Sequence, residues 1–319
     1  MTGTLYRGLQ QGGSTVWMLG KVIFPVTLLV TILQFTPVLP WLIEILTPIM
    51  GIFGLSGEAA VPLVLGNFLS LYAGIGAIVS FEFTVKEVFI MAMMLSFSHN
   101  LFIESAVASK VGVKWWLIVG IRIGLSILAG IVINLAWSGG SEQAQYGMIE
   151  PSGIIPSGWS EIILQGFQTA FTAVLQLAII VIPLMIIMQY LRDYGWLNVF
   201  SDKFAPVTRM LGMEKNTSMT LVAGLTIGLA YGASLMIQAV KEDGVSRKDM
   251  CLALIFLVSC HAVIEDTLIF IPLGIPVWPL LLIRLITAVI LTMIIAYFWR
   301  QYEIRKRRET ANEHSYHTF

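Results

Sequence analysis

The sequence predicts an all-α polytopic membrane protein that is built from two duplicated halves. Hydrophobic residues make up 57% of the 319 positions and charged residues only 12%, about half the charged fraction of a typical soluble domain. Apolar runs such as 21–35, 114–137 and 275–299 approach or exceed the roughly 20 residues that cross a bilayer core. Several such runs predict a helical bundle, because backbone polar groups in lipid must be paired within the protein.

Composition also excludes several classes of protein. The formal net charge is zero, so we expect no nucleic-acid partner. The first apolar run begins late and continues as a full span, which argues against a cleavable signal peptide. Cys251 and Cys260 lie in one apolar segment, where we interpret them as thiols rather than a disulfide pair. There is no nucleotide-binding motif and no nucleophile elbow, so we expect no enzyme activity and no tightly bound cofactor.

The duplication is visible as matches at a fixed offset. At 158 residues, Pro25 aligns with Pro183 and Gly66 with Gly224. Four extra residues near 241–246 then change the offset to 162. At this offset the rare residues align in pairs, which are His99 with His261, Glu104 with Asp266, Trp116 with Trp278, and Arg122 with Arg284. An offset of 161 would instead align Ser98 with Ser259 and Glu104 with Glu265.

Each half contains four apolar segments and one shorter amphipathic piece. In the first half, the apolar segments are 17–38, 59–80, 86–106 and 114–137, with the short piece at 40–54. In the second half, they are 161–191, 217–239, 248–272 and 275–299, with the short piece at 195–211. These boundaries predict an N-terminal segment 1–16, a first repeat 17–137, a linker 138–160, a second repeat 161–299 and a basic tail 300–319.

Loop charges predict that the two repeats are inverted in the membrane. Lys and Arg favour cytoplasmic loops, and the tail 300–308 carries five of them whereas the loop 138–160 carries none. The connection 38–58 has none, but its counterpart 192–216 has four. Equivalent loops on opposite faces require an odd number of crossings in each half.

An odd number results if one apolar segment enters and leaves on the same face. We expect re-entrant hairpins at 86–106 and 248–272, because both have polar centres. Each repeat would then have about three spanning helices, one re-entrant hairpin and one short amphipathic helix. Continuous spans at these two segments are the alternative. The inverted arrangement places both termini in the cytoplasm and the linker outside.

The polar centres supply the candidate site. An ionisable group within hydrocarbon costs at least about 2.5 kcal/mol by insertion scales, so each one needs a reason to be there. The candidates for binding a substrate or ion are Ser98, His99, Asn100, Glu104, Ser259, His261, Glu265 and Asp266. Asn100 and Glu104 are four residues apart and would share one helix face.

Two functional interpretations of these residues remain open. In one, they bind a small polar organic solute, and a carboxylate serves a coupling Na⁺ or H⁺. In the other, they ligate a divalent transition metal as the transported substrate, with the ligand set His99, Glu104, Cys260, His261, Glu265 and Asp266. Arg122 and Arg284 either recognise an anionic substrate or form salt bridges to Glu104 and Asp266. We favour the salt bridges, because an acid accompanies the arginine in each repeat.

Two other patterns belong to the helices around this site. Glycines such as Gly66, Gly74 and Gly224 favour close helix packing. Gln165, Gln168, Thr172 and Gln176 form a sparse polar stripe on one helix face, which either lines a cavity or contacts the other half.

The segments 61–135 and 221–297 resemble the nucleoside-recognition or "Gate" domain. Each has a glycine-rich helix, a His-acid motif and an Arg-bearing helix. That domain occurs in spore maturation proteins, in the membrane part of bacterial ferrous-iron permeases and, more distantly, in concentrative nucleoside transporters. The resemblance implies inverted repeats with re-entrant hairpins. It leaves the substrate open, because family members are linked both to nucleosides and to ferrous iron.

These observations together predict an ion-coupled secondary transporter in a bacterial cytoplasmic membrane. Its substrate is expected to be a nucleoside-like or other small polar solute, with divalent metal transport as the alternative. A non-transporting membrane scaffold or assembly factor is a second alternative. The expected partners are the lipid bilayer and the solute or cation, and the large apolar surface permits a homodimer.

Overall fold

The chain folds almost entirely into helices, as the computed structural model shows for residues 2–148, 158–229, 236–240 and 244–316. In this part of the chain no strand forms, although an isolated bridge pairs Thr84 with Gln143. Five described helices are long and apolar enough to cross a membrane, namely Gly3–Gln34, Val85–Lys110, Trp115–Ala136, Trp159–Leu191 and Val277–Glu309. The prediction of an all-α polytopic membrane protein is confirmed.

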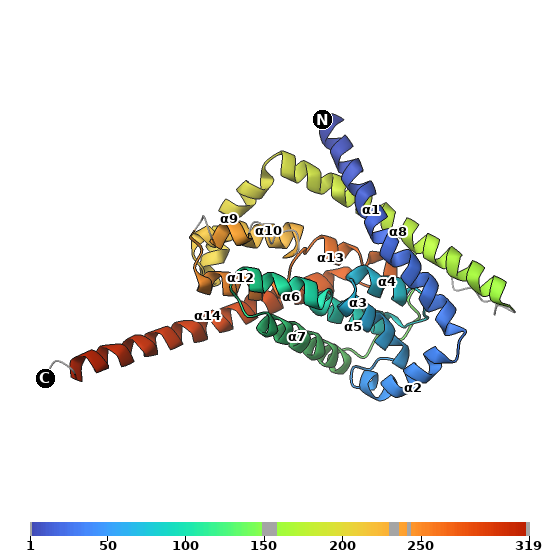
Figure 1. Ribbon diagram of the computed structural model, residues 1–319, viewed down its shortest axis with the longest axis horizontal. Coiled ribbons are helices and arrows are strands. Elements are labelled where there is room, and N and C mark those ends of the chain that lie inside the picture. Colours follow the sequence, from blue (N-terminus) through green and yellow to red (C-terminus); the bar gives the residue numbers. More distant parts are fainter. Residues whose placement is uncertain (1, 149–157, 230–235, 241–243, 317–319) are drawn as a thin grey trace.

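The first helices of the two halves, α1 (Thr2–Gln34) and α8 (Trp159–Asp193), pack side by side in opposite directions. A Cβ on Gly8 would meet Ile186, and one on Gly20 would meet Val174. Residue numbers therefore increase along α1 in the direction in which they decrease along α8, so the two helices are antiparallel. Helix α1 begins at residue 2, so residues 2–16 of the predicted N-terminal segment form its first turns (Figure 1).

A helical hairpin follows α2 (Val38–Gly51) and a 3₁₀ turn (Gly57–Ala59). Its limbs are α3 (Ala60–Phe68) and α4 (Leu71–Ile78). A Cβ on Gly74 would lie 3.0 Å from the Pro62 carbonyl oxygen and 3.1 Å from Gly66 Cα, so the limbs lie against each other. A limb of this length rises only about 12–14 Å, which is too short to cross a membrane. The prediction of one continuous span at 59–80 is therefore wrong.

The next segment runs straight past its neighbour and does not fold back. Helices α5 (Val85–Ser98) and α6 (Leu101–Lys110) lie along α7 (Trp115–Ala136) in the opposite direction. At one end, Lys86 Nζ lies 3.1 Å from the Asn134 carbonyl oxygen, and at the other, residues 111–114 join α6 to the start of α7. The predicted re-entrant hairpin at 86–106 is thus wrong, and the segment is a broken span. The polar centre indicates the break, but the direction after a break depends on packing.

The number of candidate spans in the first half is the same as predicted. The hairpin lies at 59–80 instead of 86–106, and the span lies at 86–106 instead of 59–80. The first half therefore still has three candidate spans, made by α1, by α5 with α6, and by α7.

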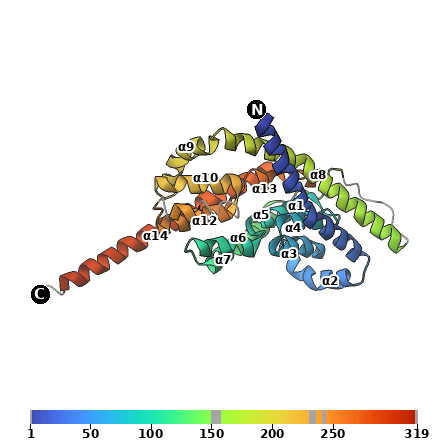
Figure 2. The same ribbon diagram turned by 45° about the horizontal axis from the view of Figure 1, so that its top comes forward.

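The second half follows the same order within its described residues. Its elements are α9 (Trp196–Met210), a 3₁₀ turn (Lys215–Thr217), α10 (Ser218–Ile227), α12 (Arg247–Ser259), α13 (Glu265–Leu268), a 3₁₀ turn (Ile271–Leu273) and α14 (Val277–Tyr316). The predicted segment 217–239 lies partly outside the described residues. Figures 1 and 2 show the C-terminal part of α14 projecting away from the bundle. The predicted tail 300–319 is thus helical as far as Tyr316.

Helices α5 and α12 are the equivalent central helices of the two halves. Every residue from Val88 to Ser98 is buried, as is every residue from Asp249 to Ser259. Both helices begin at a hydroxyl cap, because Thr84 accepts from the Glu87 N–H and Ser246 accepts from the Asp249 N–H. The two buried helices position the polar centres at their C-terminal ends.

Candidate functional site

The site begins with a break in the central helix of each half. Asn100 and Ala262 are the two non-glycine residues with positive φ in the described part of the chain, at 48° and 40°. The N–H of Asn100 donates to the Gly66 carbonyl at 3.1 Å, and that of Ala262 donates to the Gly224 carbonyl at 3.0 Å. In the first half, the break is therefore held against the end of α3, near the tip of the hairpin.

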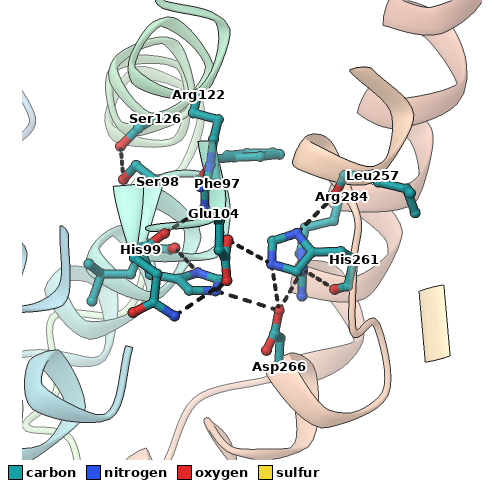
Figure 3. Close-up of polar contacts among 12 residues, drawn as sticks. Phe97, Ser98, His99, Glu104, Arg122, Ser126, Leu257, His261, Asp266 and Arg284 are labelled. Carbon is teal, nitrogen blue, oxygen red and sulfur yellow. Dashed lines mark hydrogen bonds and ion pairs between the residues drawn. The ribbon is translucent and has the colours of Figure 1, made fainter. Parts of the chain in front are cut away.

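Two histidines occupy the breaks and face each other across the halves. His99 Nδ1 lies 2.6 Å from the Leu95 carbonyl oxygen, and His261 Nδ1 lies 2.9 Å from that of Leu257. The two rings have centroids 5.2 Å apart and are tilted by 39°. Figure 3 shows both Nε2 atoms directed toward the carboxylates between the halves.

The two carboxylates connect the halves. Glu104 Oε2 lies 3.1 Å from His261 Nε2 of the other half, although without hydrogen-bond alignment, and its Oε1 lies 3.5 Å from His99 Nε2. Asp266 Oδ2 lies 3.7 Å from His261 Nε2 and 3.9 Å from His99 Nε2. All four side chains are buried. A single cluster therefore combines the two sequence motifs.

Each carboxylate is paired with the arginine of its own half. Arg122 Nη2 donates to Glu104 Oε2 at 2.8 Å, and Arg284 Nη2 donates to Asp266 Oδ2 at 3.2 Å. The same guanidinium groups also donate to the His99 carbonyl at 2.6 Å and the His261 carbonyl at 2.8 Å. They satisfy carbonyls at the ends of broken helices, where positive charge is favoured. Both arginines form the salt bridges that the sequence favoured, and the Arg–acid pairs match the offset of 162.

The other predicted site residues are placed differently. Ser98 donates to the Met94 carbonyl at 2.8 Å and Ser259 to that of Ile255 at 3.0 Å, so both hydroxyls bond to their own helices. Asn100 Nδ2 lies 3.3 Å from Glu104 Oε1 at the edge of the cluster. Cys260 is buried but is absent from the group of clustered ligand atoms found among the described residues.

Glu265 points to a partner that the sequence analysis missed. The Tyr72 hydroxyl on α4 donates to Glu265 Oε1 at 2.8 Å, which links the first hairpin to α13 of the second half. Tyr72 stands alone as a hydroxyl-bearing ring in an apolar, glycine-rich segment. That isolation was the available signal for a buried polar contact.

The histidine contacts imply a proton or a cation within the cluster. A carbonyl oxygen only accepts, so each Nδ1 beside one must carry a proton. In a neutral ring, Nε2 would then be an acceptor facing a carboxylate oxygen at 3.1 Å. Two acceptors at this distance repel unless a proton or another cation lies between them.

The same arrangement contains the elements of a metal site. One ligand atom from each of His99, His261 and Asp266 can be chosen so that all lie within 4.8 Å of one another. A metal-bound histidine usually donates its other ring N–H to a carbonyl, as both rings do here. The two arginines act against a metal, because they already neutralise the carboxylates.

Comparison with known proteins agrees with this architecture. The family model described as nucleoside recognition, Gate, matches residues 16–114 and 174–275. The chain belongs to the Gate family. The matched stretches begin 158 residues apart, at 16 and 174, which is the offset found within the sequence. The chain is also 63% identical over 296 residues to the uncharacterized membrane protein YvoD of Bacillus subtilis (strain 168), covering 93% of this chain and 95% of that protein. No solved structure matches it.

Proposed function

We propose that this Gate-family protein is a secondary transporter whose substrate site is the cluster of His99, Glu104, His261 and Asp266. The contact between Glu104 and His261 carries the proposal, because it joins the broken helices of the two halves. Buried ionisable groups within a membrane are costly and mark substrate or ion pathways. Broken helices near the middle of two repeats are a recurrent transporter site.

We further propose that the two halves are inverted repeats. Helices α1 and α8 occupy equivalent positions in the halves, and their antiparallel packing supports a two-fold axis that passes between them. Three crossings in the first half support the same arrangement, because an odd number places the second half in the opposite orientation.

The cationic loops support a cytoplasmic location for both termini. Arg7 pairs with Asp193, which places the N-terminus beside the cationic connection 192–216. Arg247 Nη2 lies 3.4 Å from the Gly112 carbonyl oxygen, beside the loop that carries Lys110 and Lys114. A Cβ on Gly212 would meet Ala296, so the basic end of α14 emerges on the same face. This face is the cytoplasmic one by the positive-inside rule.

The substrate we propose is a small polar solute, and its transport is coupled to H⁺ or Na⁺. The test is uptake into proteoliposomes by the wild type and by the double variant His99→Ala/His261→Ala. A thermal-shift panel of nucleosides and other polar solutes, with and without Na⁺ and at two pH values, identifies the solute and the coupling ion. Unchanged uptake and unchanged thermal stabilisation in the double variant would show that the site is elsewhere.

A divalent transition metal is the second candidate substrate, and the clustered ligand atoms favour it. His99, His261 and Asp266 would bind it, with Glu104 adjacent, whereas Cys260 and Glu265 lie outside that group. Metal analysis of the purified protein separates the candidates. Bound metal that is lost in His99→Ala supports cation transport, and metal-free protein stabilised by an organic solute supports the first proposal. If the purified protein transports neither an organic solute nor a metal, the second alternative, a membrane scaffold, is supported.

A further inference from the structure

A cavity of about 680 Å³ lies under the loop that follows α7, away from the histidine cluster. Its walls come from both halves, namely from the C-terminal end of α1, from α2, from residues 79–82 directly after α4, and from the N-terminal half of α8. The eight residues of α4 separate it from the hairpin tip by about 12 Å. None of the four cluster residues lines it. Its volume falls within the range of small-molecule sites.

The charged groups that line this cavity are carboxylates. Glu58 and Glu82 lie in its wall, and no Lys, Arg or His is found among its described lining residues. The nearest lysine along the chain, Lys86, directs its ammonium to the Asn134 carbonyl at 3.1 Å. Burial, together with the negative charges of Glu87 and Glu82, raises the pKa of Glu58. A bound positive charge would relieve this repulsion.

Neutral hydrogen-bonding groups surround the two acids. Three members of the polar stripe predicted on α8 line the cavity, and the fourth, Gln176, holds the loop by accepting from the Met148 N–H at 2.8 Å. Thr31 lines the cavity and is only 3% exposed, and its buried hydroxyl has no hydrogen-bond partner within the described chain. A buried hydroxyl without a partner is costly, so Thr31 indicates that a ligand or water completes its bonding.

We propose that this cavity binds a small organic cation that carries amines and further hydrogen-bonding groups. Glu58 and Glu82 would bind the amines, and the Thr31 hydroxyl and the α8 amides would bind the remainder. The site lies on the face opposite the cationic loops. It is distinct from the cluster proposed to transport solute, and it does not depend on that proposal.

Spermidine, with triethylene glycol as an uncharged probe of similar length, tests this inference on the purified full-length protein. Calorimetry should show spermidine binding, with little or no binding of triethylene glycol. Glu58→Gln and Glu82→Gln should each weaken spermidine binding by about ten-fold, which is the usual scale for one charge-assisted hydrogen bond. Glu44→Gln is the matched control, because Glu44 is an exposed acid on α2 outside the cavity wall.

Several outcomes would overturn the proposal. Equal affinity for the two probes would show that charge is not recognised. Unchanged spermidine affinity in Glu82→Gln would do the same, and this exposed position keeps the test valid if Glu58→Gln fails to fold. Loss of spermidine binding in His99→Ala would place the cation in the histidine cluster, whereas retention supports a separate cavity site.

Discussion

The central arginines of the two halves, Arg122 and Arg284, differ in how many hydrogen bonds their guanidinium groups make. Arg122 donates from Nε to the Phe97 carbonyl at 2.8 Å, in addition to its bonds to the His99 carbonyl and Glu104. Arg284 donates only to the His261 carbonyl and to Asp266, and its Nε and Nη1 have no partner in the described chain. The first half therefore provides the better satisfied framework.

The carboxylates of the two halves also differ in how closely they approach the histidine of the other half. Glu104 is one methylene longer than Asp266 and reaches the histidine of the other half at 3.1 Å, whereas Asp266 stays 3.9 Å from His99. The two copies of the motif therefore differ in degree, because Arg122 leaves only Nη1 without a partner in the described chain whereas Arg284 leaves both Nε and Nη1. Nε and Nη1 of Arg284 are buried as well as unpartnered, so we expect an acceptor of a solute that enters the cluster to bond to them, and the second half to contribute more to recognition than to stability.

Arginine substitutions test this difference and should give the largest effect. Arg122→Met should lower the free energy of unfolding by about 3–5 kcal/mol, because it leaves Glu104 buried without its partner. Arg284→Met should cost less, because Arg284 makes fewer bonds. Denaturant unfolding in detergent compares the two variants. Equal losses would mean that the two halves are equally satisfied and that the comparison fails.

Glycine substitutions should show where the halves remain alike. A Cβ on Gly66 would overlap the Leu95 side chain, and one on Gly224 would overlap Leu257 in the same way. Each Gly→Ala variant should cost about 1–3 kcal/mol from overpacking. Gly120→Ala is the matched control, because nothing lies within 4 Å of its Cβ position.

A second substitution establishes the cause of that loss. Leu95→Ala should recover part of the stability lost in Gly66→Ala, because it removes the overlapping atoms. Thermal unfolding measures the four-member cycle. Strictly additive losses in that cycle would show that crowding at Leu95 is not the cause.

The sequence predicted the composition of the cluster but could not predict its connections. His99, His261 and their acids were identifiable because, in a duplicated sequence, matches between rare residues are stronger evidence than matches between common ones. The contact of Glu104 with the opposite half was not predictable. It depends on how two broken helices meet, and no local pattern encodes that geometry.

The position of the hairpin shows the same limit. The segments 59–80 and 86–106 are both apolar and of similar length, but only the second has a histidine and an acid beyond its first turn, namely His99 and Glu104. The turn falls instead at Ser70, whose hydroxyl accepts from the Ala73 N–H and starts α4. The small residues Gly66 and Gly74 let the limbs approach. Glycine spacing of this kind is equally typical of packing between separate helices, so it did not distinguish a hairpin from a span.

The residues at the two helix breaks predict a smaller difference. Ala262 has φ of 40°, a conformation that costs about 1–2 kcal/mol for a residue with a Cβ. Ala262→Gly should therefore raise the free energy of unfolding by up to about 1 kcal/mol, after the cost of glycine in the unfolded chain. Asn100→Gly should give no gain, because asparagine tolerates this conformation and its amide contacts Glu104. A stabilised Asn100→Gly variant would contradict the explanation.

The smallest effect should come from the N-terminal end of α1 and the C-terminal end of α8, where the two halves differ again. Arg7 pairs with Asp193 at 2.6 Å, but the equivalent positions at the other end are Gln165 and Phe35. The hydrogen bond from Arg7 lowers the pKa of Asp193 below its ordinary value of 3.8. The pair should therefore stabilise the fold above pH 3.8 and lose this contribution as the pH falls through the lowered pKa.

Arg7→Gln removes that contribution at every pH. The stability difference between wild type and variant should be small at neutral pH, should shrink as the pH falls below 3.8, and should also shrink at high salt. Thermal unfolding across this pH range measures it, and Gln165→Ala at the opposite end serves as the control. A difference that persists unchanged well below pH 3.8 would mean that Arg7 stabilises α1 against α8 by packing rather than by charge.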